Sequence, residues 1–278
     1  MTMSSSASPR DIYHRPGLGM TAHVLQGREL ALLRIRVDQA ALILVDKGIK
    51  TVHAEQGAAV SAGPAQAIAV SGGQTVDFIN AVPDGEYYEA RWLVFDSALL
   101  EDAYYRDRAA QTVTQPAHRV SDIPTGLAEA FSRAAQALAP ASDIPEPVAR
   151  QRMLEVLHWL LQQGVAMRSA SPTTAVAAQV RALVSSRLGA AWTADHVASE
   201  LALSQATLRR RLAVEGASFS TLLVDTRMAA ALTLLQATTH PIGHIALAVG
   251  YESPSRFAVR FRQRFGFVPS AVRERLLP

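Results

Sequence analysis

The stretch that decides the fold of this chain reads Ile242-Gly-His-Ile-Ala-Leu-Ala-Val-Gly-Tyr251-Glu-Ser-Pro-Ser-Arg-Phe257-Ala-Val-Arg-Phe261-Arg-Gln-Arg-Phe-Gly266-Phe-Val-Pro269. In its first part, apolar residues recur at helical spacing and predict one amphipathic helix. Gly250 follows, where a helix C-terminus favours a residue that tolerates positive φ. Ser253 then stands at an N-cap position, with Pro254 as the first residue of the next helix. The stretch therefore predicts two short helices joined by a tight turn.

The second of these helices has two different sides. Phe257, Phe261 and Phe265 recur every four residues and form an aromatic inner stripe. Arginines occupy the flanks, namely Arg256, Arg260, Arg262 and Arg264. A helix–turn–helix whose second member carries an arginine-rich outer face is suited to the major groove of DNA.

The spacing of these residues resembles the signature of AraC/XylS-type transcriptional regulators. The shared pattern is Ile-x-x-Ile-Ala-x-x-x-Gly-Tyr, then Ser-x-Ser-x-Phe-x-x-x-Phe, then Phe-Gly-x-x-Pro-Ser, closed by Arg273 and uninterrupted by any gap. The resemblance implies an all-α C-terminal domain of about seven helices that contains two helix–turn–helix units. A first unit should therefore lie upstream in the chain.

A matching upstream segment is present. The sequence Ala-x-x-Leu-x-Leu-Ser-x-x-x-Leu-x-Arg-x-Leu resembles the first unit of the same family. Thr193 is expected to cap its first helix, and Ser204 its recognition helix, which contains Thr207-Leu-Arg-Arg-Arg-Leu212. Ala202 stands at the turn, where the family often has Gly or Asn, so we expect the turn to be strained.

The two units are regularly spaced. They are expected at about 193–214 and 241–265, and their caps, Ser204 and Ser253, are 49 residues apart. The same unit used twice can place two recognition helices in successive major grooves, about 34 Å apart. One chain would then contact about two turns of DNA.

The helical wheel separates buried from DNA-facing positions in each recognition helix. Leu208 and Leu212 point inward in the first helix, as Phe257 and Phe261 do in the second. The outward positions are the predicted DNA contacts: Gln205, Ala206, Arg209 and Arg210 in the first helix, and Ser255, Arg256, Val259 and Arg260 in the second.

These positions suggest different kinds of contact. Arg209 is expected to bind guanine in bidentate fashion. Arg256 and Arg260 suit either bases or phosphates, and a solvated surface charge is the alternative for any single arginine. The backbone amides at the helix N-termini capped by Ser204 and Ser253 should hold phosphates.

Charge divides the chain into two parts. Residues 174–278 contain 12 arginines, no lysine and 6 acidic residues, a net charge of about +6, whereas residues 1–173 carry about −3. A phosphate backbone attracts such a positive part. The chain contains no cysteine, which removes disulfides, thiol catalysis and thiolate metal sites. No run approaches the ~20 apolar residues of a membrane span, and the N-terminus lacks an export signal, so a cytoplasmic protein without a membrane partner is expected.

Residues 18–167 are expected to form a separate domain, after a flexible tail at 1–17. Short apolar runs between glycine-rich turns predict strands at 30–37, 41–45, 50–53, 67–70, 75–79 and 89–95. Strands of this length and spacing favour a small barrel or jelly roll. The family resemblance implies a cupin-like barrel. The expected fold class is therefore α+β, with two domains.

Helices are expected after the strands. Leu99–Tyr105 predicts a short helix, and amphipathic patterns predict helices at 124–139 and 146–167. The resemblance implies that the last two form a dimer contact, and packing against the barrel is the equal alternative. The small polar segment 168–174 is the expected linker to the DNA-binding domain at 175–278.

The barrel segment offers little for catalysis or metal binding. His23 and His53 are thirty residues apart and no His-x-His pair occurs, so we expect no metal site, no cofactor and no catalytic residue. A barrel interior is compatible with a small-molecule pocket. Arg91 and Trp92 are candidates to line it, although alternation along a strand would place them on opposite faces. The chain is not expected to be an enzyme.

Together these features predict a sequence-specific transcription regulator that binds double-stranded DNA. The resemblance implies an activator that recruits RNA polymerase, with an N-terminal domain that senses a small-molecule effector, forms a homodimer, or does both. Control by a partner protein is the alternative. A cupin-type enzyme joined to a DNA-binding module is disfavoured by the missing metal ligands. The effector, the operator and the direction of regulation stay open.

Overall fold

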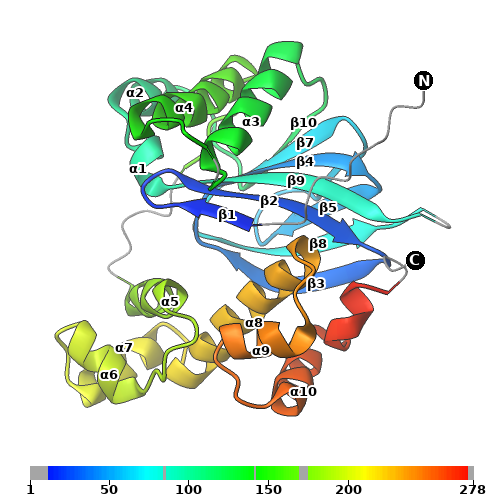
Figure 1. Cartoon of the computed structure of the whole chain (residues 1–278). Helices are drawn as coiled ribbons and strands as arrows, with labels where there is room; N and C mark the ends of the chain where they lie inside the picture. The colour runs from blue at the N-terminus through cyan, green and yellow to red at the C-terminus, as the bar shows by residue number, and fades with distance from the viewer. Residues whose placement is uncertain (1–11, 84–85, 141, 169–174, 275–278) are drawn as a thin grey trace.

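The computed structural model describes residues 12–83, 86–140, 142–168 and 175–274 (Figure 1). Nearly all of the predicted linker, residues 169–174, lies outside these ranges. The first part of the chain is a β-sandwich with helices on one side, and the second part is helical. The α+β architecture with two domains is as expected from the sequence.

Ten strands are present in the described residues, all paired in antiparallel fashion. Their bounds are β1 (Ile12–Arg15), β2 (Gly19–Gln26), β3 (Leu30–Val37), β4 (Ala41–Lys47), β5 (Ile49–Ala54), β6 (Val60–Ala62), β7 (Gln66–Val70), β8 (Gln74–Ala81), β9 (Tyr88–Phe95) and β10 (Ala117–Val120). One sheet has the order β1-β2-β9-β4-β7-β10, and the other has the order β3-β8-β5-β6.

These two sheets replace the closed cupin-like barrel that we expected. No strand pairing in the described residues joins one sheet to the other. The sheets face each other across an apolar core that includes Val24, Val45, Val52 and Val76. Ala237, at the end of helix α8, packs into the same core. A helix of the other domain thus contributes to the core between the two sheets.

Part of the segment expected to be a flexible tail is ordered. Strand β1 pairs with β2 along its whole length. Arg15 also donates from Nη1 to the carbonyl oxygens of Ala137 and Ile144, at 3.1 and 3.0 Å. The prediction of a tail over 1–17 is therefore wrong for residues 12–15, because this short segment takes its order from partners distant in the sequence.

Four helices of the N-terminal domain lie against the outer face of the larger sheet (Figure 1): α1 (Ser97–Leu100), α2 (Ala103–Ala109), α3 (Thr125–Leu138) and α4 (Glu146–Gln162). Phe131 of α3 and Leu157 of α4 pack there with Leu42 and Leu93 of the sheet. In α4, Val148 is the large hydrophobic residue that stays exposed. The apolar face of α4 is therefore covered by its own domain.

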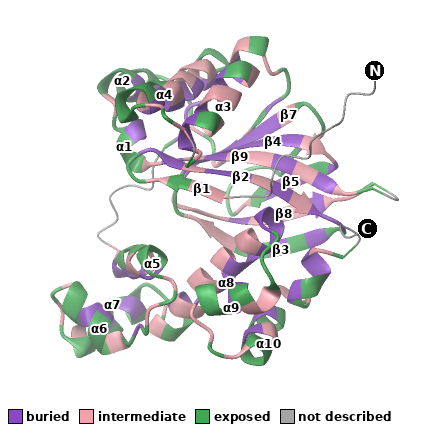
Figure 2. Ribbon diagram, in the orientation of Figure 1, coloured by how far each residue is buried: buried purple, intermediate pink, exposed green. Residues whose placement is uncertain are grey.

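The helical domain has two apolar cores. Its helices are α5 (Val176–Ser186), α6 (Ala194–Glu200), α7 (Gln205–Val214), α8 (Phe219–Ala237), α9 (Ile242–Ala248) and α10 (Pro254–Phe265), followed by a 3-10 turn, η1 (Pro269–Val272). One core lies among α5, α6 and α7. The other lies among α8, α9 and α10 and takes in Leu30 and Leu32 of β3. Figure 2 shows buried residues along these inner faces and exposed ones along the outer faces. The second helix–turn–helix thus shares its core with the N-terminal domain.

Candidate nucleic-acid interface

Each of the two recognition helices, α7 and α10, begins at a serine that caps it. Ser204 Oγ accepts a hydrogen bond from the Thr207 amide at 3.2 Å. Ser253 Oγ accepts one from the Arg256 amide at 3.4 Å, and Pro254 is the first residue of α10. The predicted caps are confirmed. Capped N-termini direct backbone amides and the positive end of the helix dipole outward, an arrangement suited to phosphate.

The helices that precede α7 and α10 end in the same kind of left-handed turn. Ala202, after α6, has φ of +53°, and Gly250, after α9, has φ of +85°. The amide of Leu203 donates to the carbonyl of Ala198 at 2.8 Å, and the equivalent bond in the second unit measures 2.9 Å. A left-handed conformation costs a residue with a Cβ atom about 1–2 kcal/mol, whereas glycine adopts it readily. The strain expected at Ala202 is therefore present.

Burial fixes which side of each recognition helix faces outward. Leu208 and Leu212 are 1% exposed and pack in the first core. Phe257 and Phe261 are fully buried in the second core, with ring centroids 5.6 Å apart. Both inner stripes are as predicted, and the rest of each helix surface is available to a partner.

The predicted contact residues lie on these outer faces. Nine are exposed: Ser204, Gln205, Ala206, Arg209, Arg210, Ser255, Arg256, Val259 and Arg260. Ser253 is partly buried because its side chain bonds the first turn of α10. The fold thus brings each set together on its own helix, and the contact of these residues with DNA stays a prediction.

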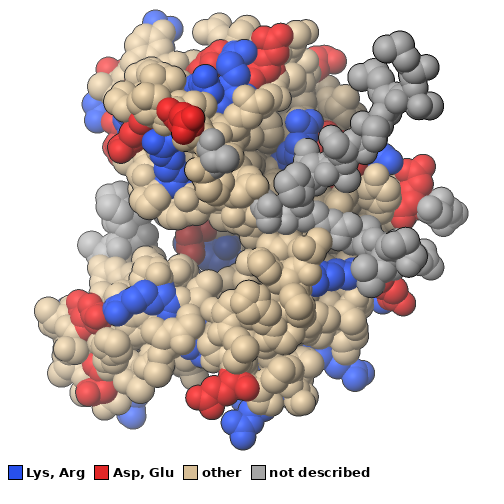
Figure 3. Space-filling view, in the orientation of Figure 1, with Lys and Arg blue, Asp and Glu red and all other residues tan. Residues whose placement is uncertain are grey.

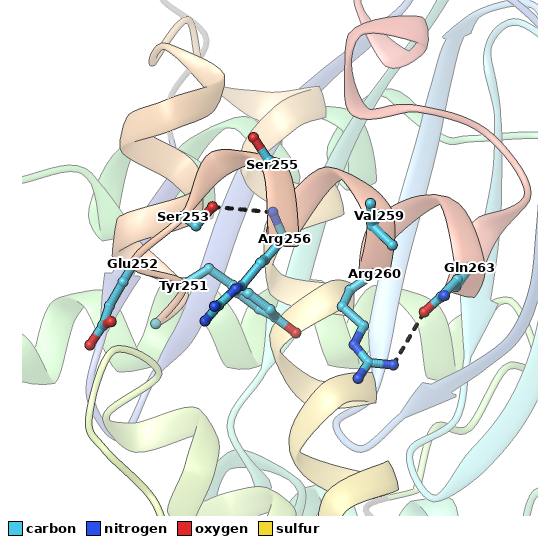
Figure 4. Close-up of a pocket in the computed structure, with 9 residues that line it drawn as sticks. Tyr251, Glu252, Ser253, Ser255, Arg256, Val259, Arg260 and Gln263 are labelled. Atoms are coloured by element: carbon cyan, nitrogen blue, oxygen red, sulfur yellow. Dashed lines mark hydrogen bonds between the residues drawn. The ribbon is translucent and has the colours of Figure 1, made fainter.

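The outer face of α10 borders a surface hollow of about 670 Å³. It is lined from the turn by Tyr251 and Glu252, and from the helix by Arg256, Arg260 and Gln263, among others. Arg256 and Arg260 extend together on one side of α10, whereas Ser255 points away from them (Figure 4). Arg260 Nη1 donates to Gln263 Oε1 at 3.2 Å. The two guanidinium groups can therefore approach the same stretch of nucleic acid.

Some arginines of this domain serve the protein itself. Arg264, at the end of α10, pairs with Asp225 at 2.7 Å. It also donates to the backbone carbonyl oxygens of Leu33 and Arg34 in β3. On the face shown in Figure 3, basic and acidic side chains are interspersed over the helical domain. The net positive charge of this domain therefore does not form one continuous patch on that face.

Residues 197–275 match the family model of a helix-turn-helix domain. The HTH-type transcriptional regulator GadX of Escherichia coli (strain CFT073) is 35% identical over 97 residues, 35% of this chain and 35% of its own. The C-terminal domain is of the AraC/XylS type. Transcriptional regulator SirC of Salmonella typhimurium is 36% identical over 87 residues, 31% of this chain and 30% of its own. The chain thus matches about a third of the length of these curated relatives.

Over nearly the whole chain, the fold is similar to that of ToxT from Vibrio cholerae. The TM-score is 0.61, with 12% sequence identity, and the match covers 91% of this chain and 97% of ToxT. The arrangement of a β-sheet domain followed by a helical domain is therefore shared with a solved structure.

The two candidate effector residues do not converge. Arg91 lies on the helix side of β9, 5.6 Å from the ring of Phe131, and binds both carboxylate oxygens of Asp46 at 2.9 and 2.8 Å. This hydrogen bond raises the pKa of Arg91. Trp92 lies on the opposite face, in the core between the sheets. A single pocket between the sheets can therefore be lined by Trp92 but not by Arg91.

Neither a metal centre nor a membrane span stands out. Within the described ranges, no three His, Asp or Glu side chains are grouped as metal ligands. No single described helix has the length and hydropathy to cross a membrane, and only α7 and α8 taken together, with a 72° bend between them, reach those limits.

Arg227, which lies where the two helix–turn–helix units meet, was not predicted from the sequence to have a role. Arg227 lies in α8, and its guanidinium donates to backbone carbonyl oxygens both of residues that precede this helix in the chain and of one that follows it. The signal available in the sequence was a single arginine inside a long apolar helix, between Leu223 and Leu235. A cation at such a position needs buried acceptors.

Proposed function

We propose that this chain is a regulator of transcription that binds double-stranded DNA in a sequence-specific manner. The observation that supports this most directly is the pair of capped helices, α7 and α10, with buried inner and exposed outer faces. Both belong to one AraC/XylS-type domain with 12 arginines. The two helices would enter successive major grooves, about 34 Å apart.

Base recognition would be divided between the helices. Arg209 is exposed on α7 and would bind O6 and N7 of a guanine through its two terminal nitrogens. Gln205 and Arg210 lie beside it on the same face. On α10, Arg256 and Arg260 would contact bases or phosphates from the hollow that they line. The capped N-termini would hold phosphates and set the register.

The first prediction concerns Arg209. A duplex that the full chain selects from a random-sequence library serves as the specific site, and random DNA as the comparison. Arg209→Ala should weaken binding to the selected duplex by about 1–3 kcal/mol and relax selectivity at one base pair. Fluorescence anisotropy titrations at fixed salt measure both affinities.

Arg187→Ala is the matched control, because Arg187 is exposed, lies outside both recognition helices and pairs with Glu200 of α6. It should leave specific binding unchanged. An equal loss on random DNA for Arg209→Ala would make Arg209 a phosphate contact. If the full chain selects no sequence at all, the proposed function is wrong.

We further propose that the N-terminal domain senses a small acidic effector between its sheets. The fully buried Lys50 donates to Asn80 Oδ1 at 2.9 Å, and its ammonium lies 4.0 Å from the ring centroid of Phe78. The hydroxyl of Tyr88 and the indole nitrogen of Trp92, also buried there, have no hydrogen-bond partner among the described residues. Donors that lack acceptors favour an anionic ligand.

The position of α8 would transmit such binding. Gln236 of α8 donates from Nε2 to Gln26 Oε1 at 2.8 Å, and Gln26 also accepts from Asn80 at 2.9 Å. Lys50 is thus linked through Asn80 and Gln26, by three hydrogen bonds in series, to a helix that joins the DNA-binding units. Solved structures of ToxT hold an unsaturated fatty acid or a naphthalenyl butenoic acid, which supports an acidic effector here. Such a ligand would shift the populations of conformers that differ in DNA affinity.

Three finer features belong to the same proposal. The chain would activate transcription through RNA polymerase. It would form a homodimer through a surface other than the apolar face of α4, which its own domain covers. It would not act as an enzyme. Control by a partner protein in place of a metabolite is the alternative.

DNA footprints of the purified protein with and without oleic acid separate control by an acidic effector from control by a partner protein. If an acidic effector controls DNA binding, oleic acid changes the footprint when no second protein is present.

A further inference from the structure

Arg227 lies near the middle of α8 and is partly buried. Its guanidinium donates three hydrogen bonds to backbone carbonyl oxygens: from Nε to Leu188 at 3.1 Å, from Nη2 to Ala190 at 2.7 Å, and from Nη1 to Gly250 at 3.1 Å. Within the described part of the chain, no carboxylate forms an ion pair with it. Its charge is therefore held mainly by backbone oxygens.

Two of the three acceptors immediately precede the first helix–turn–helix unit, and the third lies within the second unit. Leu188 and Ala190 lie in the connection from α5 to α6, which leads into the first unit. Gly250 lies in the turn of the second unit, between α9 and α10. One side chain of the connector thus binds the frameworks of both recognition helices.

The chemistry of the acceptors explains why a guanidinium is stable there. Leu188 follows the C-terminus of α5, and Gly250 follows the C-terminus of α9. Carbonyls at a helix C-terminus lack intrahelical partners and carry the negative end of the helix dipole. Desolvation lowers the pKa of Arg227, and the nearby ring of Tyr251, 5.9 Å away, opposes this shift. An arginine keeps its charge under these conditions.

The surrounding backbone is packed closely on this guanidinium. A Cβ atom on Gly250 would lie 2.5 Å from Nη2 of Arg227 and 2.9 Å from the carbonyl oxygen of Leu188. A Cβ atom on Gly189 would lie 3.4 Å from the carbonyl oxygen of Ala248. The two units therefore meet at this point, with little room to slide past each other.

We propose that Arg227 is a positioning residue that fixes the distance and rotation between the two recognition helices, and so sets the base-pair spacing that the chain accepts between its two DNA boxes. This inference rests on the proposed function. It requires no contact between Arg227 and DNA.

The test uses the full chain and the duplex that it selects from a random library. That duplex is compared with versions in which one box is scrambled, or in which one or two base pairs are inserted between the boxes. In Arg227→Lys the charge stays, but a single ammonium cannot reach three carbonyls spread over two units. We expect affinity for the two-box duplex to fall about tenfold, a partial loss of the 10²–10⁴ gain from linked binding.

The same variant should bind the single-box duplexes like the wild type, and its preference for the original spacing over the inserted ones should shrink. Arg187→Lys, the same change at an exposed arginine of this domain, should alter none of these values. Equal losses on one-box and two-box duplexes, or an unchanged spacing preference, would overturn the inference. Failure to select any duplex would instead refute the proposed function.

Gly250→Ala provides a second route if Arg227→Lys does not fold, as judged by circular dichroism. The added methyl group would displace the guanidinium without removing it. It should produce the same relaxed spacing preference, and a folded Gly250→Ala protein with the original preference would also overturn the inference.

Discussion

Lys50 shows how much a single buried side chain can influence this protein. Its ammonium has one hydrogen-bond acceptor, Asn80 Oδ1, and lies within 6 Å of the ring centroids of Phe78, Tyr88 and Trp92. No ion pair to Lys50 occurs in the described ranges. Burial lowers the pKa of Lys50 from its ordinary value of 10.5 to about 7. At pH values between these two pKa values, Lys50 keeps its proton in the unfolded chain and has lost it in the folded chain.

This difference in proton binding predicts a pH dependence of stability. Between pH 7 and 10.5 the unfolded state holds more protons at Lys50, so the free energy of unfolding should rise with pH. The rise has an upper limit of about 1.4 kcal/mol per pH unit. Lys50→Met should remove this slope and be more stable than the wild type near pH 7. Urea unfolding at several pH values measures it.

Lys47→Met is the matched control. Lys47 is half-buried, and its hydrogen bond to the Tyr87 hydroxyl at 3.0 Å raises its pKa above the ordinary value. It therefore contributes no such slope between pH 7 and 10. The prediction is wrong if the free energy of unfolding changes with pH to the same extent in the wild type and in Lys50→Met. Lys50 would then keep its proton in the folded protein.

At the scale of elements, helix α10 depends on its aromatic stripe. Phe261 is fully buried and contacts Phe257, Phe265 and Phe267, with centroid separations of 5.6, 4.7 and 5.8 Å. The opposite side of the helix carries the predicted DNA contacts. Stability and recognition therefore lie on separate faces of one helix.

We expect Phe261→Ala to lower the free energy of unfolding by about 3–5 kcal/mol, since a large cavity would form in the second core. Phe261→Leu should cost less, because most of the volume is kept. Urea unfolding measures both. At temperatures where each variant is folded, DNA affinity should stay within a few-fold of the wild type. A small destabilisation combined with a large loss of DNA binding would place Phe261 on the recognition face instead.

The elements that sequence analysis predicted well have apolar residues at a regular spacing and characteristic residues at their ends. In α7 and α10 the buried positions follow the helical repeat, and a serine at each start and a residue of positive φ before it mark the boundaries. The same helical spacing predicted which residues of α7 and α10 are buried and which lie on the outer faces. The six predicted strands likewise correspond to β3, β4, β5, β7, β8 and β9.

The strands that were missed lack such signals. Strands β1, β6 and β10 have only three or four residues, too few to show an alternation. Strand β2 begins at a glycine and contains the polar residues Thr21 and Gln26. Both are buried, and both form hydrogen bonds to residues distant in the sequence. Such partners are set by the assembled sandwich and leave no local pattern.

At the scale of the whole molecule, contacts between the domains were beyond sequence reasoning. Gln26 and Gln236 bond across 210 residues of sequence, and Arg264 bonds to β3 across about 230. Arg34, one of the acceptors, has φ of +54° at a register shift in β3. The irregular strand exposes carbonyl oxygens, and α10 reaches them through Arg264. The second helix–turn–helix is thereby held against the N-terminal domain.

We therefore predict that Arg264→Gln loosens β3 without unfolding the protein. Hydrogen exchange of the amides over residues 32–37 should become about tenfold faster, as expected for losing about 1–2 kcal/mol of hydrogen bonds to a charged donor. Amides of β9 should be unaffected. Arg262→Gln, at an exposed position of the same helix, is the control. Unchanged exchange in β3 would show that the apolar contacts alone hold the two domains together.

Leu30 and Leu32 have a practical consequence for anyone who would isolate the DNA-binding half. They belong to the same apolar core as Met228, Leu232 and Leu235 of α8. A fragment that starts at residue 175 would leave part of that core open to water, and such a surface promotes self-association. Shortened versions of this protein would then need polar replacements along α8 to stay monodisperse, whereas the intact chain supplies its own cover.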